Sequence, residues 1–150
     1  MRKKRKKLYK NYVTTEYGKE IILERKIVGW FSNKTDEILT CNLAKHTLDR
    51  QGVLKQMLRI CIHLDELNND QVGILNRRFA VKTRLYENYF IYEWGTTILL
   101  TRHEKRLIGI VHDDLCVHNY FNEKTKSREQ LVDELKIIAI EIDSLNTEEV

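Results

Sequence analysis

The chain has 150 residues, of which 42% are hydrophobic and 32% charged. This length fits one domain with its own hydrophobic core. The uncharged runs are far shorter than the roughly 20 apolar residues that a membrane span needs, and no apolar stretch follows the basic N-terminus as a secretory signal requires. The odd number of widely spaced cysteines, Cys41, Cys61 and Cys116, favours reduced thiols. We therefore expect a cytoplasmic protein with no membrane partner.

Positive charge is concentrated at the N-terminus. The formal net charge is +4, but residues 1–10 alone carry +7, which leaves −3 for the remainder, and residues 127–150 carry −5. A run of like charges repels itself and stays solvated, so residues 1–10 are predicted to form a disordered arm. Its cations are Arg2, Lys3, Lys4, Arg5, Lys6, Lys7 and Lys10. They suit phosphate contacts, an acidic partner, the acidic C-terminal segment of the same chain, or no specific contact.

The first elements predicted after the arm are a hairpin and two helices. A β-hairpin is predicted over 12–31, because β-branched residues are frequent there and Tyr17-Gly18-Lys19 suits a turn. Thr35 is predicted to cap a helix that starts at Asp36, since acidic residues favour a first helical turn. A stronger helix is predicted over 49–67, where apolar residues recur every three or four positions. Its stripe consists of Leu54, Met57, Leu58, Cys61, Leu64 and Leu67.

From 78 to 111 the pattern changes to alternation, which predicts antiparallel strands in meander order. A half-buried strand is predicted over 78–85, with its basic residues facing solvent. Residues 89–94 and 96–102 are predicted as one long strand or two, since the intervening Gly95 can mark a bend. A turn at 103–105 and a last strand at 106–111 complete three or four strands. No internal repeat and no interdomain linker are predicted.

The C-terminal segment predicts a long amphipathic helix. Ser127 and Gln130 fit a capping box at its start. The apolar stripe that follows consists of Leu131, Leu135, Ile138, Ile142 and Leu145. This stripe suits a helix that lies on the sheet, and alternatively the seam of a homodimer.

The densest group of reactive side chains lies near the end of the predicted meander: His103, Glu104, His112, Asp113, Asp114, Cys116 and His118. A metal held by His and Asp can activate water for phosphodiester hydrolysis, so a small metal-dependent nuclease is an alternative hypothesis. The metal candidates are His112, Asp113, Cys116 and His118, and this spacing lacks the paired cysteines of a strong zinc pattern. A polar loop after the last strand is the more frequent interpretation. We therefore predict no catalytic residue, metal site or cofactor.

A basic strand face is the second candidate binding surface. Its predicted members are Arg78, Lys82, Arg84 and Tyr86, with Arg102, Lys105 and Arg106 across the next turns. Cations interleaved with aromatic residues suit single-stranded nucleic acid, because cations follow phosphates and rings stack on bases. A solvated sheet face is the alternative.

Together these features predict an α+β fold with an N-terminal hairpin, an antiparallel meander and two to three helices, organised as a basic arm at 1–10 and a single domain at 11–150. The leading functional hypothesis is a non-enzymatic binding protein that acts on nucleic acid or on a protein machine that handles it. The proline-free, Lys- and Ile-rich composition resembles that of small phage and mobile-element proteins. That resemblance suggests an inhibitor of a host nuclease, similar in kind to an anti-CRISPR protein. A homodimeric scaffold is a further alternative.

Overall fold

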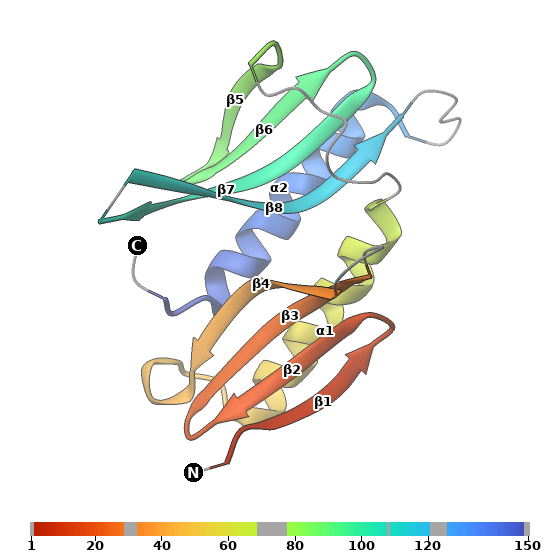
Figure 1. The fold of residues 1–150 in the computed structure, drawn as a ribbon. Helices are drawn as coiled ribbons and strands as arrows, with labels where there is room; N and C mark the ends of the chain where they lie inside the picture. Colours follow the sequence, from red (N-terminus) through yellow and green to blue (C-terminus); the bar gives the residue numbers. More distant parts are fainter. Residues whose placement is uncertain (1, 29–32, 69–77, 108, 121–125, 149–150) are drawn as a thin grey trace. The chain divides into compact units, whose positions relative to one another are not determined.

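The computed structural model describes residues 2–28, 33–68, 78–107, 109–120 and 126–148 (Figure 1). It contains two four-stranded antiparallel sheets and two long helices, which confirms the predicted α+β class. No helix within these ranges is both long and apolar enough to cross a membrane. The chain divides into two compact units, residues 1–62 with 141–149 and residues 63–140, where a single domain was predicted.

The first unit contains the first sheet, a meander of β1 (Lys4–Tyr9), β2 (Tyr12–Tyr17), β3 (Glu20–Val28) and β4 (Asn33–Asn42). The predicted hairpin over the described part of 12–31 is confirmed as β2 and β3, while Phe31 lies outside the described residues. A 3-10 turn, Leu43–Lys45, follows β4. Fully buried side chains of this sheet include Tyr12, Ile21, Leu23, Ile38, Leu39 and Cys41.

The basic arm is an edge strand, which corrects the prediction of a disordered arm. Lys4 lies opposite Glu16 and Lys7 opposite Val13 in the β1–β2 ladder. The ladder supplies backbone hydrogen bonds, and Glu16 offsets part of the like-charge repulsion. The pKa of Glu16 is lowered, first by its hydrogen bond from Arg50 and also by the charges of Lys6 and Lys4. Exposed cations on an edge strand also oppose unwanted pairing with another sheet.

The prediction of a helix that starts at Asp36 with Thr35 as its cap is wrong, because this segment is the strand β4 (Figure 1). Each residue from Asp36 to Asn42 except Ile38 has a partner on β3 in the antiparallel register, and Ile38 falls at a bulge. The acidic start of the segment lies opposite Arg25 and Glu24. Pairing with β3 therefore overrides the local capping signal.

The second unit contains the second sheet, a meander of β5 (Val81–Tyr86), β6 (Tyr89–Trp94), β7 (Thr97–Arg106) and β8 (Gly109–Asn119). Gly95 forms the turn between β6 and β7, with φ at +59°. Of the two alternatives for 89–94 and 96–102, one long strand or two strands, the structure therefore has two strands. The turn predicted at 103–105 and the loop predicted at 112–118 are both wrong, since β7 and β8 are long strands that include them. The strand predicted over 78–85 is present as β5, but it is not half-buried, because β5 is an edge strand exposed on both faces at its start.

The two helices are confirmed and begin close to the predicted positions. Helix α1 (Arg50–Leu67) and helix α2 (Arg128–Leu145) have the same length. The capping box is present: Gln130 N–H donates to Ser127 Oγ at 3.2 Å, and Ser127 N–H donates to Gln130 Oε1 at 3.0 Å. All five residues of the predicted α2 stripe are fully buried within the chain. On α1, Leu54 and Leu58 are only half-buried, whereas Val53 and Ile60 are fully buried.

The chain is built from an internal repeat of four strands and a helix, so the prediction of no internal repeat is wrong. Residues 8–25 align without gaps with residues 85–102, and half of the aligned positions are identical. The identical pairs are Leu8/Leu85, Tyr9/Tyr86, Asn11/Asn88, Tyr12/Tyr89, Glu16/Glu93, Gly18/Gly95, Ile21/Ile98, Leu23/Leu100 and Arg25/Arg102. Each sheet has the same strand order, and the register shifts fall at equivalent places.

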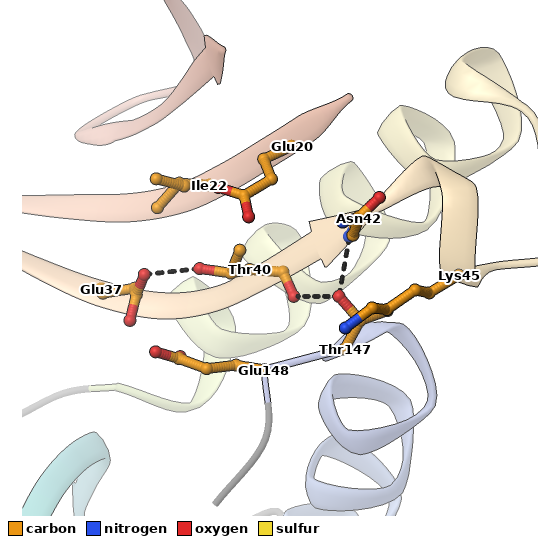
Figure 2. A pocket seen from close by; sticks show the side chains of 8 residues that line it. All are labelled: Glu20, Ile22, Glu37, Thr40, Asn42, Lys45, Thr147 and Glu148. Atoms are coloured by element: carbon orange, nitrogen blue, oxygen red, sulfur yellow. Dashed lines mark hydrogen bonds between the residues drawn. The ribbon is translucent and has the colours of Figure 1, made fainter. Parts of the chain in front are cut away.

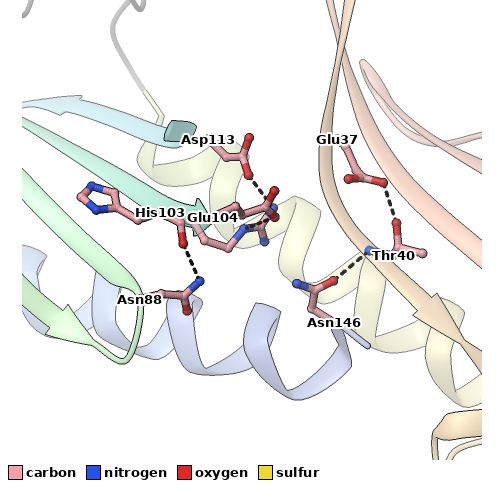
Figure 3. A network of polar contacts seen from close by, with 8 residues as sticks. Glu37, Thr40, Asn88, His103, Glu104, Asp113 and Asn146 are labelled. Carbon is pink, nitrogen blue, oxygen red and sulfur yellow. Dashed lines mark hydrogen bonds and ion pairs between the residues drawn. The ribbon is translucent and has the colours of Figure 1, made fainter. Parts of the chain in front are cut away.

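Hydrogen bonds repeat with the sequence. Lys26 N–H donates to the Asn11 carbonyl at 2.8 Å, and His103 N–H donates to the Asn88 carbonyl at 2.8 Å. The Asn11 and Asn88 side chains return a bond to the same two partners, at 3.0 and 2.9 Å (the second is drawn in Figure 3). The preceding turn residues have φ values of +48° and +49°. The repeat is therefore a property of the backbone as well as of the sequence.

The C-terminal end of α2, the helix after β8, belongs to the first unit. The C-terminal end of α1, the helix after β4, belongs to the second unit. In the first unit, Asn146 after α2 accepts a hydrogen bond from the Thr40 amide of β4 at 3.1 Å (Figure 3). In the second unit, Asn68 after α1 accepts a hydrogen bond from the Val117 amide of β8 at 2.8 Å. The two asparagines occupy equivalent positions of the repeat, so the same hydrogen bond is present in both units.

Candidate nucleic-acid interface

One face of the second sheet combines exposed cations with aromatic rings. Alternation along β5 and β6 places Lys82, Arg84, Phe90, Tyr92 and Trp94 on this face, which we call the basic aromatic face. Lys82 lies opposite Tyr92 in the ladder, and Arg84 lies opposite Phe90. The register therefore sets each cation beside a ring.

The cations of this face lie over the rings. Lys82 Nζ is 4.5 Å from the centroid of the Phe90 ring and 6.0 Å from that of Tyr92. Arg84 Cζ is 5.4 Å from the Phe90 centroid. The negative face of a ring attracts a cation without neutralising its charge. Neither Lys82 nor Arg84 forms an ion pair with another described residue, so their charges are available to an anion.

Two histidines extend the ring cluster onto β7 and β8. The His103 ring stacks on Phe90 with centroids 4.2 Å apart, and its Nε2 atom lies 3.1 Å from the Tyr92 hydroxyl. The His112 ring meets His103 edge-on at 4.4 Å. The far side of Phe90 is thus occupied by the protein's own side chain, which fixes the ring in place.

Two rings at the margin of this face remain open to solvent. Trp94 is 46% exposed and Phe79 is 61% exposed, and their ring centroids lie 6.1 Å apart. The Arg78 guanidinium lies 5.8 Å from the Phe79 centroid. Such an exposed pair of rings beside cations is what a stacked base and its phosphates require.

The structure separates the basic residues that the sequence had grouped. Lys82 and Arg84 are exposed on β5, Tyr86 is half-buried beside Tyr89, and Lys105 is exposed near the end of β7. Arg2, Lys3 and the β1 cations belong to the first unit, and Lys10 occupies the β1–β2 turn above the Tyr9 ring. The side chain of Arg106 lies outside the described part of the chain. Arg102 is only 1% exposed, so its prediction as a surface contact is wrong.

Arg102 instead belongs to a buried ion network with Glu104 and Asp113, two residues that are labelled in Figure 3. Its guanidinium nitrogens lie 3.3 Å from Glu104 Oε1 and 3.4 Å from Asp113 Oδ2, and the group lies 5.9 Å from the Tyr89 ring centroid. Burial raises the pKa of Asp113 to about 6, Arg102 opposes this shift and Glu104 adds to it. Arg25 is buried at the equivalent position, so a buried arginine is part of the repeated core.

The reactive cluster proposed for a nuclease is brought together only in part, at the contact between the His103 and His112 rings. Asp113 pairs with Arg102, Asp114 accepts a hydrogen bond from Thr101 at 3.0 Å, and buried His118 donates to the Leu67 carbonyl. Cys116, Cys41 and Cys61 are buried, and none of them forms a disulfide within the part of the chain that the structure describes. Among the described residues, no three His, Cys, Asp or Glu side chains converge as a metal site would require. Their strand geometry distributes them between the two faces of β8.

A hollow of ≈ 380 Å³ lies on the first sheet (Figure 2). It is lined by Glu20, Ile22, Glu37, Thr40, Asn42, Lys45, Thr147 and Glu148. Thr147 Oγ1 accepts a hydrogen bond from the Asn42 amide at 2.7 Å and donates to the Thr40 carbonyl at 3.3 Å. Thr40 Oγ1 donates in turn to Glu37. These bonds attach the segment after α2 to β4, which gives the lining a structural role.

Comparison with protein-family models, with characterised proteins and with solved structures finds no match to this chain. Sequence reasoning found Lys82 and Arg84 but missed the contribution of Phe79, Phe90 and His103. Alternation in 89–94 was the available signal, because it places Phe90 on the same face as Tyr92 and Trp94.

Proposed function

We propose that the protein is a non-enzymatic binding protein that holds single-stranded nucleic acid on the basic aromatic face of its second unit. The observation that carries this proposal is the pairing of Lys82 and Arg84, which form no ion pair among the described residues, with an aromatic row that ends in exposed rings. The cations would contact phosphates, and Trp94 and Phe79 would stack on bases. A single strand is favoured over a duplex because only unpaired bases offer their faces to side chains.

The proposal is limited to nucleic acid itself. A nuclease target, as for an anti-CRISPR inhibitor, was suggested by composition alone, and nothing in the described residues favours it. A homodimer through the α2 stripe is not proposed either, since that stripe is already buried within one chain. The scattered His and Asp side chains of β8 give no support to hydrolysis.

Oligonucleotide binding measured at several salt concentrations tests the proposal. Fluorescence anisotropy with an oligothymidine of about 15 nucleotides should show binding that weakens with salt, with a logarithmic slope of about −0.7 per phosphate contacted. The double substitution Lys82→Gln with Arg84→Gln should reduce the steepness of that slope by about 1.4. Trp94→Ala should weaken binding roughly 5- to 100-fold, as expected for loss of one stacked base.

A matched control removes the same charge elsewhere. Lys55 and Arg59 are exposed on α1, and Lys55→Gln with Arg59→Gln changes the net charge equally. This control should leave the salt slope nearly unchanged. Equal losses in the two double variants would show that binding follows net charge alone and would overturn the assignment to the basic aromatic face. Absence of any binding by the parent protein at low salt would overturn the proposed function.

A further inference from the structure

The internal repeat allows the chain to be compared with itself. Half of the aligned positions in 8–25 and 85–102 are identical. We expect the residues that both copies retain to be those that both copies require. Most of the retained residues have a visible role in folding. Tyr12/Tyr89, Ile21/Ile98, Leu23/Leu100 and Arg25/Arg102 are buried pairs.

Other retained residues hold turns or helices. Gly18 and Gly95 occupy equivalent turns with φ at +60° and +59°, a region that favours glycine. Glu16 binds Arg50 through two hydrogen bonds of 2.6 and 2.9 Å. Glu93 binds Arg128 in the same way, with both bonds at 2.6 Å. These carboxylates attach the first turn of each helix to the second strand of its own sheet.

A last set of shared features has no such role. An exposed aromatic residue ends the second strand of each sheet, Tyr17 at 47% exposure and Trp94 at 46%. On the edge strand beside it, two cations lie on the same face: Arg5 opposite Thr15 and Lys7 opposite Val13 in the first sheet. Lys82 and Arg84 occupy the equivalent positions of the second sheet. The residue types differ between the copies, but the cationic and aromatic character is the same.

On the first sheet these groups share their face with acidic side chains: Glu24 lies opposite Val13, and its carboxylate accepts a hydrogen bond from Thr15 Oγ1 at 2.9 Å. Both Arg5 and Lys7 are exposed, and the Arg5 guanidinium donates a long 3.4 Å hydrogen bond to the Thr35 hydroxyl. Val13 and Thr15 replace the rings of Phe90 and Tyr92 beneath the cations. The first unit therefore holds its cations less firmly in place than the second unit does.

We propose that each unit carries one copy of the same binding surface, so that one chain holds two segments of single-stranded nucleic acid. The first-unit surface consists of Arg5, Lys7 and Tyr17, and the second-unit surface consists of Lys82, Arg84 and Trp94. The inference rests on the proposed function and adds the number of nucleic-acid segments that one chain binds. Loss of the fixed rings makes the first site the weaker one, by roughly tenfold for one missing stacking or cation–ring contact.

Native mass spectrometry with an oligothymidine of about 8 nucleotides, within the range that one small single-strand-binding domain covers, counts bound strands directly. The parent protein should bind two strands per chain at saturation, with two affinities. Tyr17→Ala should remove the weaker event and Trp94→Ala the tighter one, and the double variant should remove both. Both side chains are exposed, so circular dichroism should show an unchanged fold.

A second pair of variants makes the test independent of the aromatic residues. Arg5→Gln with Lys7→Gln should remove the weaker event and leave the tighter one, and Lys82→Gln with Arg84→Gln should do the reverse. One strand per parent chain, lost in Trp94→Ala and unaffected by changes at Arg5, Lys7 and Tyr17, would overturn the two-site inference and leave the proposed function standing. No strand bound to the parent chain would overturn both.

Discussion

The two equivalent asparagines, Asn68 and Asn146, give a prediction that uses the repeat as its own control. Each side chain accepts a hydrogen bond from a part-buried strand amide, Val117 N–H at 2.8 Å and Thr40 N–H at 3.1 Å. Replacing either asparagine by alanine leaves that amide without its acceptor. An orphaned amide of this kind costs about 1 to 3 kcal/mol of unfolding free energy. At this chain length that corresponds to a fall in Tm of roughly 3 to 10 °C.

Urea denaturation followed by circular dichroism, with calorimetry for Tm, measures the effect. Asn68→Asp and Asn146→Asp retain a carboxylate oxygen as the acceptor, so they should keep most of the stability that the alanine variants lose. Because the two bonds are equivalent in the repeat, the two alanine variants should differ by less than about 1 kcal/mol. The reasoning is refuted if the alanine variants are as stable as the parent, or if aspartate costs as much as alanine.

Three further predictions concern the core, a turn and the buried ion network. Ile138→Ala should lower the free energy of unfolding by about 2 to 5 kcal/mol, because the Ile138 side chain is fully buried. The neighbouring Ile137 is exposed, so Ile137→Ala should change the free energy of unfolding by less than about 0.5 kcal/mol in the same denaturation assay. Gly95→Ala should lower the free energy of unfolding by roughly 1 to 2 kcal/mol. The cause is the positive φ alone, since nothing lies within 4 Å of the added methyl group. A variant whose stability is within about 0.3 kcal/mol of the parent protein would contradict this backbone strain. The pKa of Asp113 rises from 3.8 to about 6 on folding, so the folded protein binds more protons in this window, and this group's contribution to stability is lost as pH rises from about 4 to 6. Asp113→Asn should therefore stabilise the protein by about 1 to 3 kcal/mol at pH 7.5 and by much less at pH 4; equal effects at the two pH values would contradict the assignment.

The elements with strong periodicity could be read from the sequence. The α2 stripe and its capping box were predicted residue by residue, because a helix with one apolar face carries its own local evidence. The turn at Gly18 was equally visible, whereas Gly95 was predicted only as a bend within one long strand or a break between two. The failures fall in segments where local signals were weak or in conflict, namely the basic arm, the segment after Thr35 and the long β7–β8 hairpin.

The candidate interface was only partly accessible from sequence. Lys82 and Arg84 were identified by alternation along one strand. Their rings lie on the next strand, and only the pairing register sets Lys82 beside Tyr92 and Arg84 beside Phe90. The same uncertainty placed Arg102 on the surface, although its strand position directs it into the core. Charge alone does not tell an exposed cation from a buried one.

The basic character of the N-terminus was determined by the sequence alone, and so were the helical stripes, the tight turns and the repeated Leu-Tyr-x-Asn-Tyr motif of 8–12 and 85–89. Only the tertiary structure decided that the basic segment is a strand, because its conformation depends on a ladder with β2 and on Glu16, which are supplied by another part of the chain. Only the tertiary structure decided which end of each helix completes which sheet, because the bonds from Asn68 and Asn146 join residues far apart in sequence. Local propensity acts over a few residues, whereas pairing register and burial depend on partners that the fold brings together.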